Sequence, residues 1–231
     1  MAGRVLIVTP VEKELVALAA RFADDDLETT EQAGRVRAFE IPSLGVLCAA
    51  AGHGKAQLAL VTQHLLDTRD PFGAVIVAGA AGALDPTLRP GDVVVGTEAV
   101  EHDYKSRFHG VGPPPRHAAD EGLHAAVLAA QPERVAFRVH TGPIAGGDED
   151  IVDPDRAREL AESTGALCVA WEGAGCARAA AFSGIPFLEV RAVTDAADGA
   201  AAESYRVHLD EAVGNVGRVL LAWLRWRPGG P

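Results

Sequence analysis

Short apolar runs bounded by turn residues recur along the whole chain, and this recurrence most limits the folds that the chain can adopt. Each run is short enough for a β-strand, and several are apolar on both faces, as buried central strands are. The runs cover residues 5–8, 36–41, 45–50, 74–78, 92–97, 138–144, 166–169 and 187–193. Helical apolar periodicity lies between several of them, at residues 10–22, 55–66, 153–163, 172–182 and 210–226. Strands that alternate with helices predict an α/β fold with a largely parallel sheet covered on both faces.

One connection departs from this alternation and predicts a hairpin. Residues 36–41 and 45–50 are joined through Pro42-Ser-Leu-Gly45, a short turn of the kind that links hairpin strands. The sheet is therefore expected to be mixed. The chain of 231 residues shows no internal repeat and no low-complexity linker, and its length suits one α/β domain. We expect residues 1–231 to form a single domain.

The charge of the chain restricts its partners. A formal net charge of -11 and a pI near 5.1 argue against a nucleic-acid backbone or an anionic membrane as partner. A phosphorylated small ligand is still allowed, because a local patch can differ in sign from the net charge. The chain turns polar at Thr9, too early for the apolar core of a signal peptide. No run approaches the roughly 18 apolar residues of a membrane span.

The cysteines and histidines give no sign of a metal site. Cys48, Cys168 and Cys176 lie in apolar or Ala-rich surroundings without CxxC spacing. This pattern predicts buried free thiols in a reducing cytoplasm. The histidines show no HxxxH or HxH spacing, so we expect neither a bound metal nor another cofactor.

Acidic residues follow several of the apolar runs. Asp195 comes just past the predicted strand that begins at Phe187, and Glu14 and Glu172 follow apolar runs in the same way. Ligands of open α/β sheets bind outside the carboxyl ends of strands, where an acid can protonate a leaving group or anchor a polar substrate. Glu14 is suited to hold an attacking water, and Glu172 to accept hydrogen bonds from the vicinal hydroxyls of a sugar. The structural alternative is that Asp195 caps the next helix and that Glu14 lies in a first helical turn because the helix dipole favours acidic residues there.

Glycine-rich segments mark further candidate positions. Gly79-Ala-Ala-Gly82 follows a predicted strand and allows close approach of a ligand to the backbone, but a tight structural turn is the favoured interpretation. In the similar turn Gly52-His-Gly-Lys55, His53 is placed to touch a ligand and Lys55 to begin a solvated helix face. The polar segment 102–115 predicts a lid, an interface arm or a surface excursion. Residues 199–203 are a second candidate mobile loop.

Taken in order, these segments resemble the nucleoside phosphorylase/nucleosidase superfamily. Residues 75–95 are similar to the pattern TGSAGGLxPxLxxGDIVV of the methylthioadenosine/S-adenosylhomocysteine nucleosidases. Further similar segments are Pro10-Val-Glu-Lys-Glu-Leu15, Gly52-His-Gly-Lys55, Gly146-Gly-Asp148, Val169-Ala-Trp-Glu-Gly-Ala174 and Val190-Arg-Ala-Val-Thr-Asp-Ala-Ala-Asp198. The resemblance implies a three-layer α/β/α sandwich around a central mixed, mostly parallel sheet. It also implies assembly as a homodimer or a larger homo-oligomer.

The resemblance assigns roles to individual residues. Asp195 resembles the general acid that protonates N7 of a purine, so that the base leaves from an oxocarbenium-like transition state. Glu14 resembles the residue that orients and deprotonates the attacking water, and Glu172 the acceptor for the ribose 2′- and 3′-hydroxyls. Arg191 and Thr194 would position Asp195 and the water. Residues similar to the remaining substrate-binding positions are Gly79, Ala80, Ile151, Asp150, Trp171 and His53.

Some of these positions depart from the nucleosidase pattern. Trp171 stands where the pattern has Met, beside the ribose, and His53 replaces a small apolar residue near the 5′-substituent. Asp150 stands where an aromatic residue usually covers the adenine. It cannot stack; either it accepts a hydrogen bond from an amino group, or it is solvated and another aromatic residue covers the base. These departures suggest a base or a 5′-group other than the usual pair.

The resemblance favours hydrolysis over phosphorolysis. Phosphorylases of this superfamily hold phosphate with an Arg and a Ser or Thr, and this chain has Val77 and Ala80 at those places. We therefore expect a hydrolase of a 5′-modified purine nucleoside. The alternatives are a hydrolase of futalosine, an adenosyl-hopanoid or another specialised nucleoside, a purine nucleoside phosphorylase, and a non-catalytic nucleoside-binding domain.

Overall fold

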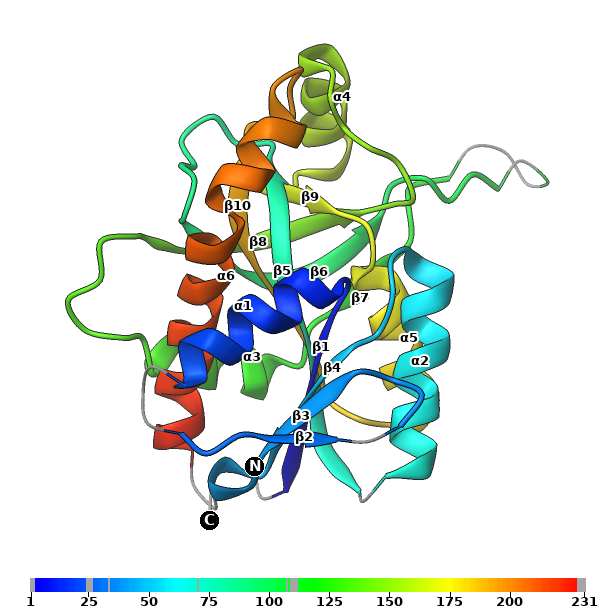
Figure 1. The fold of residues 1–231 in the computed structure, drawn as a ribbon. Helices are drawn as coiled ribbons and strands as arrows, with labels where there is room; N and C mark the ends of the chain where they lie inside the picture. Colours follow the sequence, from blue (N-terminus) through cyan, green and yellow to red (C-terminus); the bar gives the residue numbers. More distant parts are fainter. Residues whose placement is uncertain are drawn as a thin grey trace.

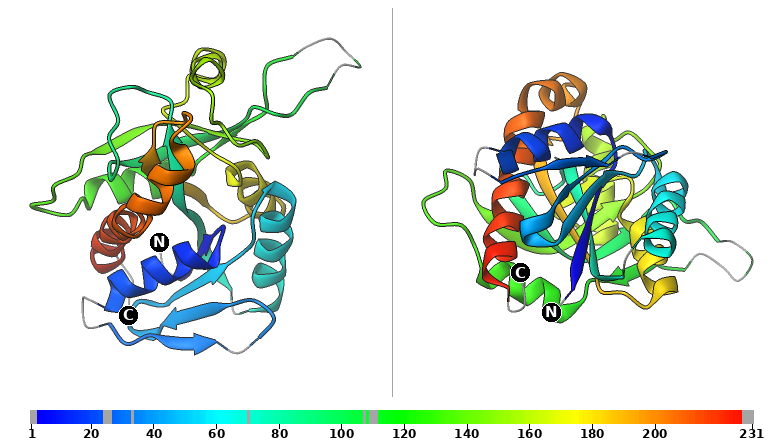
Figure 2. Two further views of the ribbon diagram at one scale, coloured as in Figure 1. Left: turned by 45° about the horizontal axis from the view of Figure 1, so that its top comes forward. Right: turned by 60° about the horizontal axis from the view of Figure 1, so that its bottom comes forward.

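The computed structural model describes residues 3–23, 27–32, 34–69, 71–106, 108 and 112–227. They form three layers, with a β-sheet between two groups of helices (Figure 1). One face is covered by α1 (Glu12–Ala23), α3 (Glu121–Ala129) and α6 (Ala201–Trp226), and the other by α2 (Lys55–Thr68) and α5 (Gly173–Ser183) (Figure 2). α4 (Pro154–Thr164) packs beside one end of the sheet. The expected α/β/α sandwich is confirmed.

The sheet contains parallel and antiparallel pairs, as expected. Its strands are β1 (Arg4–Thr9), β2 (Thr30–Gln32), β3 (Ala38–Ile41), β4 (Val46–Ala50), β5 (Phe72–Ala83), β6 (Val93–Glu101), β7 (Arg116–Ala118), β8 (Val139–Gly146), β9 (Cys168–Ala170) and β10 (Phe187–Asp195). β1 lies between β4 and β5 and runs parallel to both, and β10 runs parallel to β5. β3 and β4 form the predicted antiparallel hairpin.

Half of the sheet closes on itself. β5 pairs with β10 and β9, while β6 pairs with β10 and β8 and β8 pairs with β9, which completes a ring of strands. All of these strands contribute to one buried cluster that includes Ala81, Val94, Ile144, Cys168 and Val193. β1, β4, β3 and β2 continue from β5 as an open sheet. Within the ring β5 and β10 are paired along their length, and their carboxyl ends lie beside those of β1 and β4.

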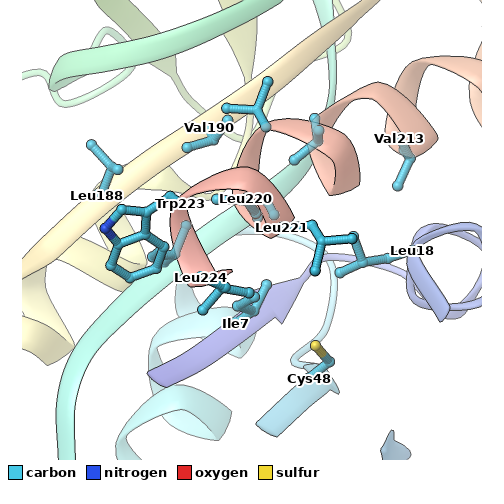
Figure 3. Close-up of a cluster of buried hydrophobic side chains, with 14 of the residues drawn as sticks. Ile7, Leu18, Cys48, Leu188, Val190, Val213, Leu220, Leu221, Trp223 and Leu224 are labelled. Atoms are coloured by element: carbon cyan, nitrogen blue, oxygen red, sulfur yellow. The ribbon is translucent and has the colours of Figure 1, made fainter. Parts of the chain in front are cut away.

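The apolar pattern of the central strands explains the two cores. Val5 and Ile7 of β1 face the side of α1 and α6, whereas Leu6 and Val8 face the side of α2 and α5. Successive side chains of a strand point to opposite faces, so a strand buried on both faces must be apolar throughout. Figure 3 shows the core on the side of α1 and α6, where Trp223 of α6 lies beside Leu188 of β10; Ile7 of β1 and Leu18 of α1 belong to the same cluster.

The structure differs from the expectations at several segments. Residues 79–82 are not a turn, because β5 continues through Ala83 and pairs there with β10 and β9. Residues 199–203 are not a separate loop, since α6 begins at Ala201, where Ser204 Oγ donates a hydrogen bond to the Thr194 carbonyl (2.8 Å). α3, β2 and β7 were not expected. Of the segment 102–115, residues 107 and 109–111 lie outside the described residues.

Two further features concern the ends and the cysteines. Arg227, at the end of α6, donates a hydrogen bond to the Gly3 carbonyl (3.1 Å), so the two ends of the described chain lie side by side (Figure 1). Cys48, Cys168 and Cys176 are buried free thiols, as predicted. Within the described ranges, every helix is too short or too polar to span a membrane.

Candidate active site

A cavity of about 380 Å³ opens at the edge where β1, β4, β5 and β10 end. Its volume lies within the usual range of small-ligand pockets, roughly 300–1,000 Å³. The strand order β4-β1-β5-β10 explains its position, because parallel strands bring the segments that follow them to one edge. The lining residues are Pro10, Val11, Glu14, His53, Ala80, Ala81, Gly82, Glu149, Asp150, Ile151, Val152, Val169, Ala170, Trp171, Glu172, Arg191, Thr194, Asp195, Ala201, Ala202 and Tyr205.

Arg191, on β10, is the central cation of the site and is 1% exposed. Its Nε donates to Glu189 Oε1 (2.8 Å), and one terminal nitrogen donates to Glu172 Oε2 (3.0 Å). The other terminal nitrogen donates to the Ala80 carbonyl (3.3 Å). Burial by itself lowers the pKa of Arg191, but the charges of Glu189, Glu172 and Glu14 outweigh it and raise the pKa. The guanidinium therefore stays charged and ties β10 to β5 and to the start of α5.

Glu14, in the first turn of α1, turns its carboxylate into the cavity and is 3% exposed. Its Oε1 accepts from the Ala80 backbone N–H (2.8 Å), and its Oε2 accepts from the Val11 N–H (3.2 Å). Burial raises the pKa of Glu14 to about 7, although Arg191 and the two N–H donors oppose the shift. A carboxyl with such a pKa can exchange a proton near neutral pH.

Glu172 links two parts of the site. It precedes α5 and is 3% exposed. Its Oε2 is held by Arg191, while its Oε1 accepts from the Gly54 backbone N–H (3.3 Å). The His53 Nε2 atom lies 3.9 Å from the same Oε1 atom. The fixed carboxylate lines the cavity, so it is placed to accept hydrogen bonds from a polar ligand.

Asp195 is the last residue of β10 and is 9% exposed. Its Oδ2 accepts from Thr194 Oγ1 (2.8 Å) and its Oδ1 from the Ala197 N–H (3.0 Å). Burial raises the pKa of Asp195, and these two hydrogen bonds oppose the rise. Asp195 does not cap α6, whose N-terminus has no side-chain cap. The helix-capping alternative is therefore wrong for this residue.

His53 and Trp171 form one wall of the cavity. Their rings stack with centroids 4.1 Å apart and an interplanar angle of 29°. Because His53 follows β4 and Asp195 ends β10, β1 and β5 separate them along the sheet edge. The stacked pair and the Asp195 carboxyl therefore lie toward opposite ends of the cavity. Glu172 lies at the stacked end, beside His53.

Asp150 and Ile151 come from the loop between β8 and α4. Ile151 is buried and packs with Leu84 and Ala197, next to Asp195, whereas Asp150 is exposed at the rim. Tyr205 of α6 also lines the cavity, and burial, followed by the charges of Glu14 and Glu172, raises the pKa of its phenol. Tyr205 was not expected from the sequence. The sequence gives one sign of it, an aromatic residue ten positions after Asp195. The segment around Tyr205 is not predicted to be helical, so its direction toward the cavity could not be inferred.

The structure brings the expected site residues together, with one exception. Asp195, Glu14, Glu172, Arg191 and Thr194 all line the cavity, as do His53, Ala80, Asp150, Ile151 and Trp171. Gly79 does not line it. A Cβ atom at Gly79 would lie 2.7 Å from Glu14 Oε1, so this glycine makes room for the carboxylate rather than for a ligand.

Lys55 does not lie on a solvated helix face, contrary to the expectation. Its side chain is 18% exposed, and its Nζ donates to Glu101 Oε1 (2.9 Å) and to Asp103 Oδ1 (2.5 Å). The Lys55 backbone N–H donates to Asp148 Oδ1 (2.9 Å), which ties the His53 turn to the loop after β8. Through the part of the chain that the structure describes, no group of three or more His, Cys, Asp or Glu side chains has the arrangement of a metal site.

Comparisons with known proteins identify the family of this chain. Residues 4–225 match the family model of the phosphorylase superfamily. The 5′-methylthioadenosine/S-adenosylhomocysteine nucleosidase of Geobacillus kaustophilus is 31% identical over 226 residues, which cover 94% of this chain and 95% of that protein. The Bacillus subtilis nucleosidase of the same name is 30% identical, with 90% and 93% covered.

Solved structures give the same result. The S. pneumoniae nucleosidase, in complex with the transition-state inhibitor MT-ImmA, superposes with a TM-score of 0.84 at 25% identity and covers 96% of this chain and 98% of its own. A Helicobacter pylori futalosine hydrolase shares the fold, with a TM-score of 0.84 at 21% identity and coverage of 97% and 98%. The match of residues 4–225 to the family model shows that the chain belongs to the phosphorylase superfamily.

Proposed function

We propose that this protein hydrolyses the N-glycosidic bond of a 5′-modified purine nucleoside, of the methylthioadenosine or S-adenosylhomocysteine type, and releases the free base and the modified ribose. One observation carries the proposal: Glu14, Glu172 and Asp195 converge from three separate segments on one cavity. The names of the similar nucleosidases supply the substrate class. A nucleoside-binding domain without activity would have no need of a buried carboxyl that takes up protons near neutral pH.

The proposed reaction uses each carboxyl differently. Asp195, whose pKa is raised by burial, gives a proton to N7 of the purine as the bond between C1′ and N9 breaks. Glu14, whose pKa is raised to about 7, takes a proton from the water whose oxygen bonds to C1′. Glu172 accepts hydrogen bonds from the ribose 2′- and 3′-hydroxyls. Arg191 and Thr194 hold Glu172 and Asp195 in place.

Water is favoured over phosphate as the nucleophile, because the cavity offers no free cation of permanent charge among its described lining residues. Arg191 is already bonded to Glu189, Glu172 and the Ala80 carbonyl. Val77 is fully buried in the core on the side of α2 and α5, and Ala80 carries no anion-binding group. Phosphate would instead meet the carboxylates of Glu14 and Glu172.

The experiment is purine release from methylthioadenosine in the presence and absence of phosphate. We expect the same rate in both, because water is the nucleophile, with 5-methylthioribose rather than its 1-phosphate as the product. Base release is followed by absorbance, and the sugar product by mass spectrometry. An absolute requirement for phosphate, or a sugar 1-phosphate product, would make the protein a phosphorylase.

The stack of His53 on Trp171 favours a second candidate nucleoside for the same hydrolysis. His53 and Trp171 present a flat wall at the end of the cavity away from Asp195. A nucleoside with a bulkier 5′-group, such as futalosine, is the alternative substrate that this wall supports. The ratio of kcat/KM for futalosine to that for methylthioadenosine decides between them, and a ratio above one favours the alternative.

We also propose that residues 1–231 form a single domain that acts in the cytoplasm as a homodimer or larger homo-oligomer. The buried free thiols support a reducing compartment. Tyr104 and Phe108 support assembly, since both are exposed aromatic residues. Light scattering coupled to gel filtration measures the oligomer, and a monomeric mass would contradict the assembly.

A further inference from the structure

A buried carboxyl outside the cavity carries a role that the proposed reaction does not use. Glu189 lies on β10, two residues before Arg191, and is 2% exposed. We infer that Glu189 is a positioning residue, which tethers the Arg191 guanidinium so that Arg191 can hold Glu172 in the cavity. This inference rests on the proposed function for its catalytic consequence, but the tether itself does not.

The contacts of Arg191 show how the tether works. Nε donates to Glu189 Oε1 (2.8 Å), while one terminal nitrogen donates to Glu172 Oε2 (3.0 Å). A guanidinium is planar, so fixing Nε and one terminal nitrogen fixes the direction of the whole group. The second terminal nitrogen then reaches the Ala80 carbonyl (3.3 Å). Since the Ala80 N–H donates to Glu14, one guanidinium is connected to Glu172 directly and to Glu14 through the Ala80 backbone.

The buried position of Glu189 lowers the stability of the fold, which argues against a role in stability alone. Its Oε2 atom is buried and accepts no hydrogen bond from any described residue. An unsatisfied buried carboxylate oxygen destabilises a fold. The carboxylate also requires glycine at the first position of α5, because a Cβ atom at Gly173 would overlap Oε2. Glu189 therefore also packs directly beside Glu172, the residue before Gly173.

The charge of Glu189 has a second consequence, which acts through Arg191. The charged and titratable groups that face Glu189 are Arg191, Glu172, Cys168 and Cys176. Those that face Glu14 are Arg191, Glu172 and Tyr205. Arg191 lowers the pKa of Glu14, so a carboxylate that partly neutralises Arg191 keeps the pKa of Glu14 high. Removal of that charge shifts the ionisation of Glu14 to lower pH.

The first experiment detects the tether without catalysis. The side-chain Nε–H of Arg191 is assigned by ¹⁵N NMR and its exchange with solvent is measured in the wild type, Glu189→Gln and Glu189→Ala. We expect slow exchange in the wild type and in Glu189→Gln, which keeps an acceptor oxygen, and faster exchange in Glu189→Ala. Equal exchange in the wild type and Glu189→Ala would overturn the tether.

The second experiment measures its consequence with methylthioadenosine as the substrate. We expect Glu189→Ala to raise KM roughly tenfold, the size of one lost charge-assisted hydrogen bond, because Glu172 is no longer held for the ribose. Glu189→Gln should restore KM and move the acidic limb of kcat/KM to lower pH. A matched control, Glu40→Gln, removes a carboxylate that is paired with Arg4 far from the cavity. It should change neither KM nor the pH of the acidic limb of kcat/KM.

The outcomes separate this inference from the proposed function. If the wild type releases no base from methylthioadenosine, the proposed function fails for this substrate, and the NMR measurement still decides the tether. If the wild type is active but Glu189→Ala keeps its KM, the positioning role is wrong. Should Glu189→Ala fail to fold, Gly173→Ala displaces the same carboxylate and should raise KM similarly; an unchanged KM there would equally overturn the role.

Discussion

Glu14 shows how one residue acquires its chemistry from its surroundings. Arg191, two backbone N–H donors and burial act on the same carboxyl in opposite directions, and burial prevails, so that the pKa rises from 4.5 to about 7. Glu12 lies two residues earlier, in the same first turn of α1, but it is exposed and forms an ion pair with Arg37. The two glutamates have the same local sequence setting, and only their positions relative to the sheet separate them.

The raised pKa of Glu14 predicts a dependence of stability on pH. Between pH 4.5 and 7 the folded protein keeps a proton that the unfolded chain releases, so the contribution of Glu14 to stability falls as the pH rises through this window. Glu14→Gln removes the ionisation and should be more stable than the wild type at pH 8 by up to about 3 kcal/mol, with little difference at pH 4. Urea unfolding at both pH values measures this difference in the free energy of unfolding. Glu12→Gln is the control, and a difference for Glu14→Gln that does not grow with pH would contradict the assignment.

Asp195 carries the other residue-scale prediction. Asp195→Asn keeps the size of the side chain but removes the transferable proton, so kcat should fall by roughly 10²–10⁴-fold. Binding of an unreactive nucleoside analogue, measured by calorimetry, should remain within a few-fold of the wild type. Asp120→Asn, which alters the N-cap of α3 away from the cavity, is the matched control. Loss of binding together with activity would make Asp195 an anchor rather than an acid.

At the scale of elements, the strongly periodic segments could be predicted from the sequence and the weak ones could not. α2 and α5 match their expected ranges closely. α3 buries only Leu123 and Val127, although its N-cap, Asp120, was a readable signal. The first turns of α6 are held by a contact with the Thr194 carbonyl. β5 continues through its Gly-Ala segment because β10 and β9 pair with it there, and such pairing overrides local turn preference.

The packing of α5 against α2 predicts a clear effect of a small substitution. A Cβ atom at Gly175 would overlap the carbonyl oxygen of Lys55, the first residue of α2. Gly175→Ala should therefore destabilise the fold by roughly 1–2 kcal/mol, after the gain in helix propensity offsets part of the strain. Gly214→Ala is the matched control, since Gly214 lies inside α6 with open space around it, and it should stabilise by about 0.5–1 kcal/mol. Thermal unfolding measures both; equal effects would show that α2 and α5 do not meet so closely.

At the scale of the whole molecule, the order of the strands creates the site. Glu14, Glu172 and Asp195 are far apart in the chain, yet the segments after β1, β9 and β10 meet at one cavity. Closure of β5, β10, β6, β8 and β9 into a ring fixes this meeting point. The ring could not be predicted from periodicity, because a period of two identifies a strand and its faces but not its neighbours.

The amino-acid sequence alone determines the alternation of strands and helices, the hairpin, and the identity of the acidic residues in the family motifs. These depend on local periodicity and on short spacings, which are properties of neighbouring residues. The pKa of Glu14, the stack of His53 on Trp171, and the tether from Glu189 to Arg191 depend on burial and on contacts between distant segments. Those properties exist only after strand pairing has brought β4, β1, β5 and β10 together and removed their carboxyl ends from water.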